Sequence, residues 1–143
     1  MVLKMNYNKI NQKFLGEYLE LDKALCEKFS TKSGVTEYIK KLSDAKHASG
    51  RDNVLPRLTK YRSLRNRIAH EPGALKDIDT ITKDDILWLR SFRKSASRGK
   101  DPLSRYLKRA SDIATGRAFK RALILAGIAA AALAVIVLIF VLI

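Results

Sequence analysis

Apolar residues recur at steps of three and four over most of the chain, which is the spacing of one face of an α-helix. The first stripe predicts a helix over about residues 8–29 and consists of Ile10, Phe14, Tyr18, Leu21, Leu25 and Phe29. A second, shorter helix is expected with Ser33 as its N-cap and an end before Gly50. No stretch alternates with the period of two that is typical of a β-strand, so the pattern indicates an all-α protein.

The second half of the chain predicts three more helices. The third begins near Asp52 and is stopped by Pro72 and Gly73. Residues 76–80 are expected to form a loop, after which Thr82 is a well-placed N-cap for the fourth helix.

Trp88 falls within the apolar cluster of this fourth helix, so we expect it to anchor the core. Asp101 and Pro102 are a strong start signal for the fifth helix, in which Gly116 is the only candidate hinge. The bundle therefore has four to five helices.

Residues 122–143 contain no charged, amide or hydroxyl side chain. At a rise of 1.5 Å per residue, such a helix is about 33 Å long, enough to cross a hydrocarbon core of about 30 Å. A buried core helix of this kind needs a domain that covers it on every side, which the remaining basic chain hardly supplies. The sequence thus predicts a C-terminal transmembrane anchor.

Three cations, Arg117, Lys120 and Arg121, precede this segment and are expected to hold that end on the cytoplasmic side. The first ten residues lack the apolar core of a signal peptide. We therefore expect a tail-anchored, single-pass protein of the bacterial inner membrane with a cytoplasmic N-terminal domain. The expected division is a helical bundle over 1–110, a basic juxtamembrane segment over 111–121 and the transmembrane helix over 122–143.

The net charge of +14 comes from 28 Lys and Arg against 14 Asp and Glu, and most of it lies after residue 50. Such a gradient indicates a polyanion or an anionic membrane surface as partner. The one cysteine, Cys26, is expected to be a small core residue. With two distant histidines, His47 and His70, it cannot form a metal cluster at the usual spacing, so we expect neither a metal nor another cofactor.

The third helix carries five cations in fourteen residues without an acid, opposite its apolar stripe: Arg57, Lys60, Arg62, Arg65 and Arg67. Asn66 and His70 are four residues apart and share a helix face, whereas Arg65 lies about 140° around from His70. These residues suggest an RNA-facing surface. Two copies about a two-fold axis would offer Arg65, Asn66 and His70 to one cleft.

The segment Arg65–His70 resembles the HEPN superfamily, small helical bundles whose nuclease members carry Arg, then four to six residues, then His, often with Asn directly after the Arg. The resemblance implies an all-α, HEPN-like four-to-five-helix bundle followed by the single C-terminal transmembrane helix. It also implies a metal-independent endoribonuclease in which the ribose 2′-OH attacks the neighbouring phosphate. We expect this protein to form a homodimer or a higher homo-oligomer. His70 would be the general acid and base, Arg65 would stabilise phosphoryl charge and Asn66 would orient the scissile group.

The same resemblance implies RNA as the substrate, and the charge of Arg57, Lys60, Arg62 and Arg67 makes them the expected RNA-binding residues. By analogy with the fold, the protein is expected to serve stress response or defence against phage, with an antitoxin or defence-system partner. Pro72 stands where toxins of the nucleotidyltransferase-paired branch place a Tyr, so regulation through that residue is not expected. Acidic residues of the first helix, Glu17, Glu20 and Asp22, are expected to pair with the basic third helix.

Other interpretations stay open at this point. His70 is alternatively a helix-end residue that interacts with the helix dipole. The protein is alternatively a non-catalytic adaptor that binds RNA or a partner, or an effector that perturbs the membrane. A stripe of small residues in the anchor favours self-association in the membrane; it consists of Ala122, Ala126, Ala130 and Ala134. The alternative is that these alanines simply face lipid.

Overall fold

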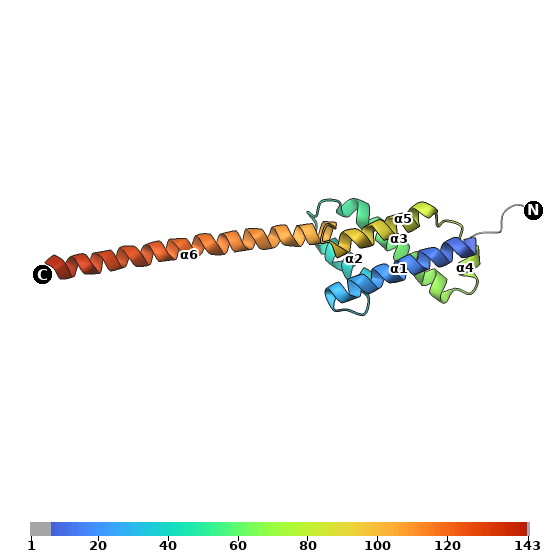
Figure 1. Cartoon of the computed structure of the whole chain (residues 1–143), viewed down its shortest axis with the longest axis horizontal. Helices are drawn as coiled ribbons and strands as arrows, with labels where there is room; N and C mark the ends of the chain where they lie inside the picture. The colour runs from blue at the N-terminus through green and yellow to red at the C-terminus, as the bar shows by residue number, and fades with distance from the viewer. Residues whose placement is uncertain (1–6, 143) are drawn as a thin grey trace, which may run out of the picture. The chain divides into compact units, whose positions relative to one another are not determined.

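The protein folds into helices connected by short turns, as a computed structural model that describes residues 7–142 shows (Figure 1). The helices are α1 (Tyr7–Phe29), α2 (Gly34–Asp44), α3 (Arg51–His70), α4 (Ala74–Asp77), α5 (Lys83–Ser97) and α6 (Pro102–Leu142). Residues 7–142 contain no strand. The predicted fold class, an all-α chain with a long apolar C-terminal helix, is confirmed.

The chain divides into two compact units, with the boundary between Tyr106 and Leu107. This boundary falls inside α6, so the first unit is a bundle that includes the start of α6. The second unit is the rest of that helix, which is uninterrupted at Gly116 as far as Leu142. Of the helices described, one is long and apolar enough to cross a membrane.

Helix α1 is the centre of the bundle, because α2, α3, α4 and α5 all pack against it. Its apolar stripe is buried together with aromatic residues of the neighbouring helices. Phe14 packs edge-on against Tyr61 of α3, with ring centroids 5.4 Å apart. Trp88 stacks on Phe92 at 4.9 Å and also contacts Tyr61, so it does anchor the core, although it is only partly buried.

Glu17 and Glu20 of α1 pair with α5, which corrects the expectation that they pair with α3. Nε of Arg90 donates to Glu17 at 2.9 Å, and Arg93 lies 3.5 Å from both Glu17 and Glu20. The packing of α1 against α5 brings these side chains together. The spacing of residues along one helix does not predict which other helix its polar side chains will meet.

Asp22 caps α2, a role that we had expected of Ser33. Its Oδ1 accepts a hydrogen bond from the backbone N–H of Val35 at 2.8 Å, whereas the Ser33 side chain makes no capping bond. The two helices approach closely at Gly34, where an added Cβ would lie 2.4 Å from backbone atoms of α1. Cys26 is partly exposed, and its Sγ accepts from the Gly34 N–H at 3.1 Å, so it is not the core residue that we had expected.

A one-turn helix, α4, replaces part of the loop expected after α3. The reason is Asn11 of α1, which is fully buried and whose Nδ2 donates to the carbonyls of Leu75 and Ile78 at 2.9 and 2.8 Å. These two bonds hold the segment that follows His70 against α1. The predicted caps elsewhere are confirmed, since Thr82 and Asp85 form a reciprocal capping box at the start of α5.

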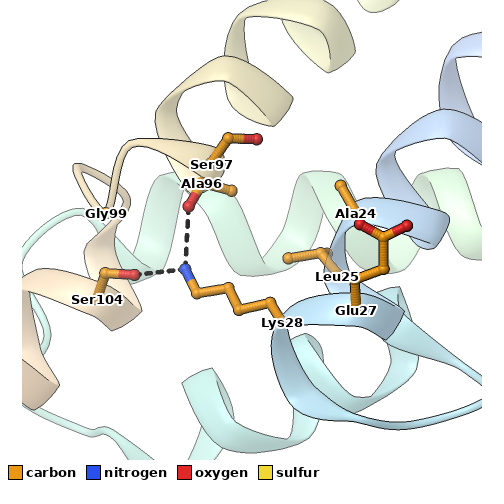
Figure 2. A pocket seen from close by; sticks show the side chains of 8 residues that line it. All are labelled: Ala24, Leu25, Glu27, Lys28, Ala96, Ser97, Gly99 and Ser104. Carbon is orange, nitrogen blue, oxygen red and sulfur yellow. Dashed lines mark hydrogen bonds between the residues drawn. The ribbon is translucent and has the colours of Figure 1, made fainter.

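The start of α6 is built around the fully buried carboxylate of Asp101. It accepts hydrogen bonds from the Tyr38 hydroxyl at 2.7 Å and the Ser104 N–H at 3.1 Å, and it pairs with Lys28 at 3.2 Å. Figure 2 shows the same Lys28 reaching from α1 to the Ala96 carbonyl and the Ser104 hydroxyl. Asp101 is therefore the predicted N-cap and also joins α1, α2 and α6.

We predict that Asp101→Asn lowers the free energy of unfolding of the bundle by about 2 kcal/mol at pH 7, because Lys28 loses its counter-charge and one acceptor becomes a donor. Burial disfavours the charged form of Asp101, but the bonds from Ser104 and Tyr38 and the charge of Lys28 outweigh it and hold its pKa below the usual value. The stabilisation is thus complete above about pH 4 and is lost as the pH falls through the folded-state pKa.

Urea unfolding of the full chain in detergent, followed by the fluorescence of Trp88, measures this difference, since Trp88 is the only tryptophan and lies in the bundle. The gap between wild type and Asp101→Asn should shrink on acidification. Asp112→Asn, an exposed change on α6, is the control and should have no effect. A gap that is equal at pH 7 and pH 3, or a control that destabilises equally, would contradict the role of Asp101.

Candidate functional site

The exposed face of α3 carries an open depression near the C-terminal end of the helix. Asn66 and His70 both line it, as their spacing of four residues predicted, and both are exposed. The rest of the lining consists of Thr59, Arg62, Ser63, Arg67 and Glu71. One helix and the residue after it therefore supply an imidazole, an amide, two hydroxyls, two guanidinium groups and a carboxylate.

Arg65 lies beside this depression and does not line it. Its Nη1 donates to Oδ1 of Asn66 at 3.2 Å, so the guanidinium reaches the edge of the Asn66 side chain. Its charge also acts on Tyr18 of α1. Burial and the Asp22 carboxylate raise the pKa of Tyr18 to about 12, while the charges of Arg65 and Arg62 oppose that rise. The structure thus brings Asn66 and His70 together in the depression. Arg65 lies at its edge, where it contacts Asn66.

Two of the expected RNA-binding residues face α5. The guanidinium carbon of Arg57 lies 5.2 Å from the centre of the Trp88 ring, which is the geometry of a cation–π contact. Lys60 lies near Asp85. Burial tends to raise the pKa of Asp85, but hydrogen bonds from Tyr61 and Thr82, together with the charge of Lys60, lower it. Arg57 and Lys60 are exposed on the side of α3 toward α5, and the depression is formed without them.

Sequence reasoning missed three residues of the depression. Thr59 and Ser63 lie eleven and seven residues before His70, so helical periodicity alone could have found them on its face. Glu71 follows α3 directly and pairs with Arg67 at 3.2 Å, which places a carboxylate in an otherwise basic site. The net positive charge of the depression is lower than the run of arginines suggested.

No cluster of histidine, cysteine, aspartate or glutamate within the described part of the chain could hold a metal ion. Arg117, Lys120 and Arg121 are exposed on α6, in the second unit, ahead of the apolar stretch. None of the three makes an ion pair with a residue that the structure describes.

These features define a basic helical bundle with a polar depression on one helix and an apolar helix long enough to cross a membrane. The chain belongs to a family of unknown function, DUF6548, whose model matches residues 12–122. The match runs from within α1 to the basic part of α6, and it includes every residue of the depression. No curated protein and no solved structure matches the chain.

We predict that Arg57→Ala destabilises the bundle by about 0.5–1 kcal/mol, through loss of the cation–π contact with Trp88. Arg67→Ala removes only an exposed pair and should change stability less. Urea unfolding followed by Trp88 fluorescence measures both. Equal effects of the two substitutions would mean that the Arg57 contact contributes nothing beyond a surface charge.

Proposed function

We propose that this protein is a membrane-anchored, metal-independent endoribonuclease of the HEPN type. The observation that supports the proposal best is that Asn66 and His70 line one open depression beside Arg62, with Arg65 hydrogen-bonded to Asn66 at its edge. These are the groups that 2′-OH transesterification requires: an imidazole that can accept and donate a proton, and cations for the phosphoryl oxygens.

In the proposed reaction, the 2′-oxygen of a ribose forms a bond to the adjacent phosphorus and the bond to the 5′-oxygen breaks. The imidazole of His70 accepts the proton of the attacking hydroxyl, and a protonated imidazole delivers one to the leaving 5′-oxygen. The products are a 2′,3′-cyclic phosphate and a 5′-hydroxyl. Arg65 and Arg62 stabilise the charge that develops on the phosphoryl oxygens, while Asn66 orients the scissile group.

A second copy of the chain is part of this proposal, because one α3 leaves the depression open on one side. Two depressions facing each other across a two-fold axis would supply one His70 as base and the other as acid. Confinement of α6 in a membrane raises the effective concentration of the bundles and so favours the pair.

We place the protein in the bacterial inner membrane with the bundle in the cytoplasm. Support for this orientation comes from Arg117, Lys120 and Arg121, since cations beside a span are retained on the cytoplasmic side. RNA is available in that compartment. A role in stress response or defence against phage, with an antitoxin or defence partner, rests on analogy with the fold alone.

A second candidate is a non-catalytic adaptor that binds RNA at the membrane. One observation favours it: among the hydrogen bonds between described residues, none orients the imidazole of His70. A general base is commonly held by a third group, as the histidine of a catalytic triad is. The two candidates differ in whether RNA is cut.

We predict that the full chain in detergent cleaves end-labelled RNA in the presence of EDTA and leaves 2′,3′-cyclic phosphate ends. His70→Ala and Arg65→Ala should each lower the rate by at least about a hundredfold, through loss of proton transfer and of charge stabilisation. Lys40→Ala, an exposed change on α2, is the control and should cleave normally. Intact RNA in every lane, with binding retained in a gel-shift assay, would support the adaptor instead.

We also predict that protease added outside bacterial spheroplasts leaves the bundle intact, and that lysis of the spheroplasts exposes it. Replacing Arg117, Lys120 and Arg121 by alanine should weaken this protection, because these cations determine the orientation. Immunoblotting for the bundle provides the measurement. Digestion of the wild-type bundle before lysis would contradict the proposed orientation.

A further inference from the structure

An open groove with an apolar floor lies where α1 and α5 begin, on helices other than α3. The two helices run side by side, and both begin at the same end of the bundle (Figure 1). Ile10 of α1 and Ile86 and Leu87 of α5 supply the apolar surface of the groove. Leu87 is 58% exposed, more than any other large apolar side chain described before Leu107. A side chain of this kind at the mouth of a groove favours a docking surface.

Lysines surround this apolar surface. Lys9 and Lys13 line the groove from α1 and Lys83 lines it from α5. None of the three forms an ion pair with a residue in the described part of the chain. Arg90 also lines the groove, but its guanidinium is held by Glu17.

Two acids lie close by in the first turn of α5, and only one is free to face outward. The carboxylate of Asp85 is engaged by Thr82 and by the Tyr61 hydroxyl, which lies 2.7 Å away. Asp84 is exposed and does not line the groove. The rim of the groove is therefore cationic, and the positive end of the α5 dipole adds to its potential.

We propose that this groove binds an acidic amphipathic α-helix of a second protein. The apolar floor favours an apolar helix face over a nucleic-acid backbone, and the lysines match Glu or Asp on the flanks of such a helix. Lys83 to Arg90 spans seven residues, or about 10 Å of helix, which accommodates about two turns of a partner. The proposal concerns a different surface from the depression on α3 and does not depend on RNA cleavage.

The test uses the full chain in a nonionic detergent and a fluorescein-labelled synthetic peptide of about fourteen residues. The peptide carries leucines at the i, i+4 and i+7 positions of one helix face and glutamates on the flanks. A scrambled peptide of the same composition has the same charge but no apolar face. Fluorescence anisotropy should show that the amphipathic peptide binds at least about tenfold more tightly than the scrambled one.

Leu87→Ser should weaken binding of the amphipathic peptide about tenfold, since the leucine leaves water on binding. The control Leu19→Ser removes another exposed leucine, 47% exposed on α1 and outside the groove, and should leave binding unchanged. Lys13→Ala with Lys83→Ala should weaken binding about threefold and reduce its salt dependence, whereas Lys40→Ala should not. All five sites are exposed, and circular dichroism checks that each variant folds.

Equal binding of the two peptides, or equal effects of Leu87→Ser and Leu19→Ser, would overturn the proposal. Overall charge alone would then explain the binding. Displacement of the peptide by a single-stranded RNA oligonucleotide, together with weaker RNA binding by Leu87→Ser, would assign the groove to RNA instead. Loss of RNA cleavage in His70→Ala leaves the peptide result unaffected, so the groove and the proposed nuclease site are tested separately.

Discussion

The bundle depends on one buried carboxylate, that of Asp101. An ionised carboxylate without water is unfavourable by several kcal/mol unless donors surround it. Here they come from three helices: the Tyr38 hydroxyl of α2, the Lys28 ammonium of α1 and the Ser104 N–H of α6. Because these donors converge on one group, Asp101 determines where α6 begins on the bundle. The long apolar helix therefore starts from a point that the folded core defines.

The cations of α3 have different neighbours, so the positive charge of the chain does not gather on one binding surface. Arg57 lies over Trp88, and Lys60 lies near Asp85 of α5. The guanidinium of Arg62 remains in the open depression with His70. The lysines of the groove belong to α1 and α5, so the two surfaces use different helices. No residue lines both surfaces.

Most helix boundaries were predictable from the sequence, because starts and stops depend on residues a few positions apart. The capping box of Thr82, the stop after His70 and the start at Pro102 are all local signals, and the structure has each of them. The one-turn helix α4 was missed because its position depends on Asn11, more than sixty residues away. Of the candidate site, the shared face of Asn66 and His70 was predictable, since helical periodicity determines it.

The sequence by itself thus determined the all-α class, most of the helices, the long apolar helix and the common face of Asn66 and His70. Each depends on a period of 3.6 residues or on contacts within one or two turns. Only the tertiary structure decided that Glu17 pairs with Arg90, that Asp22 caps α2 and that Arg57 packs on Trp88. These partners lie on different helices, and the order of residues along one helix does not specify which neighbour its polar face will meet.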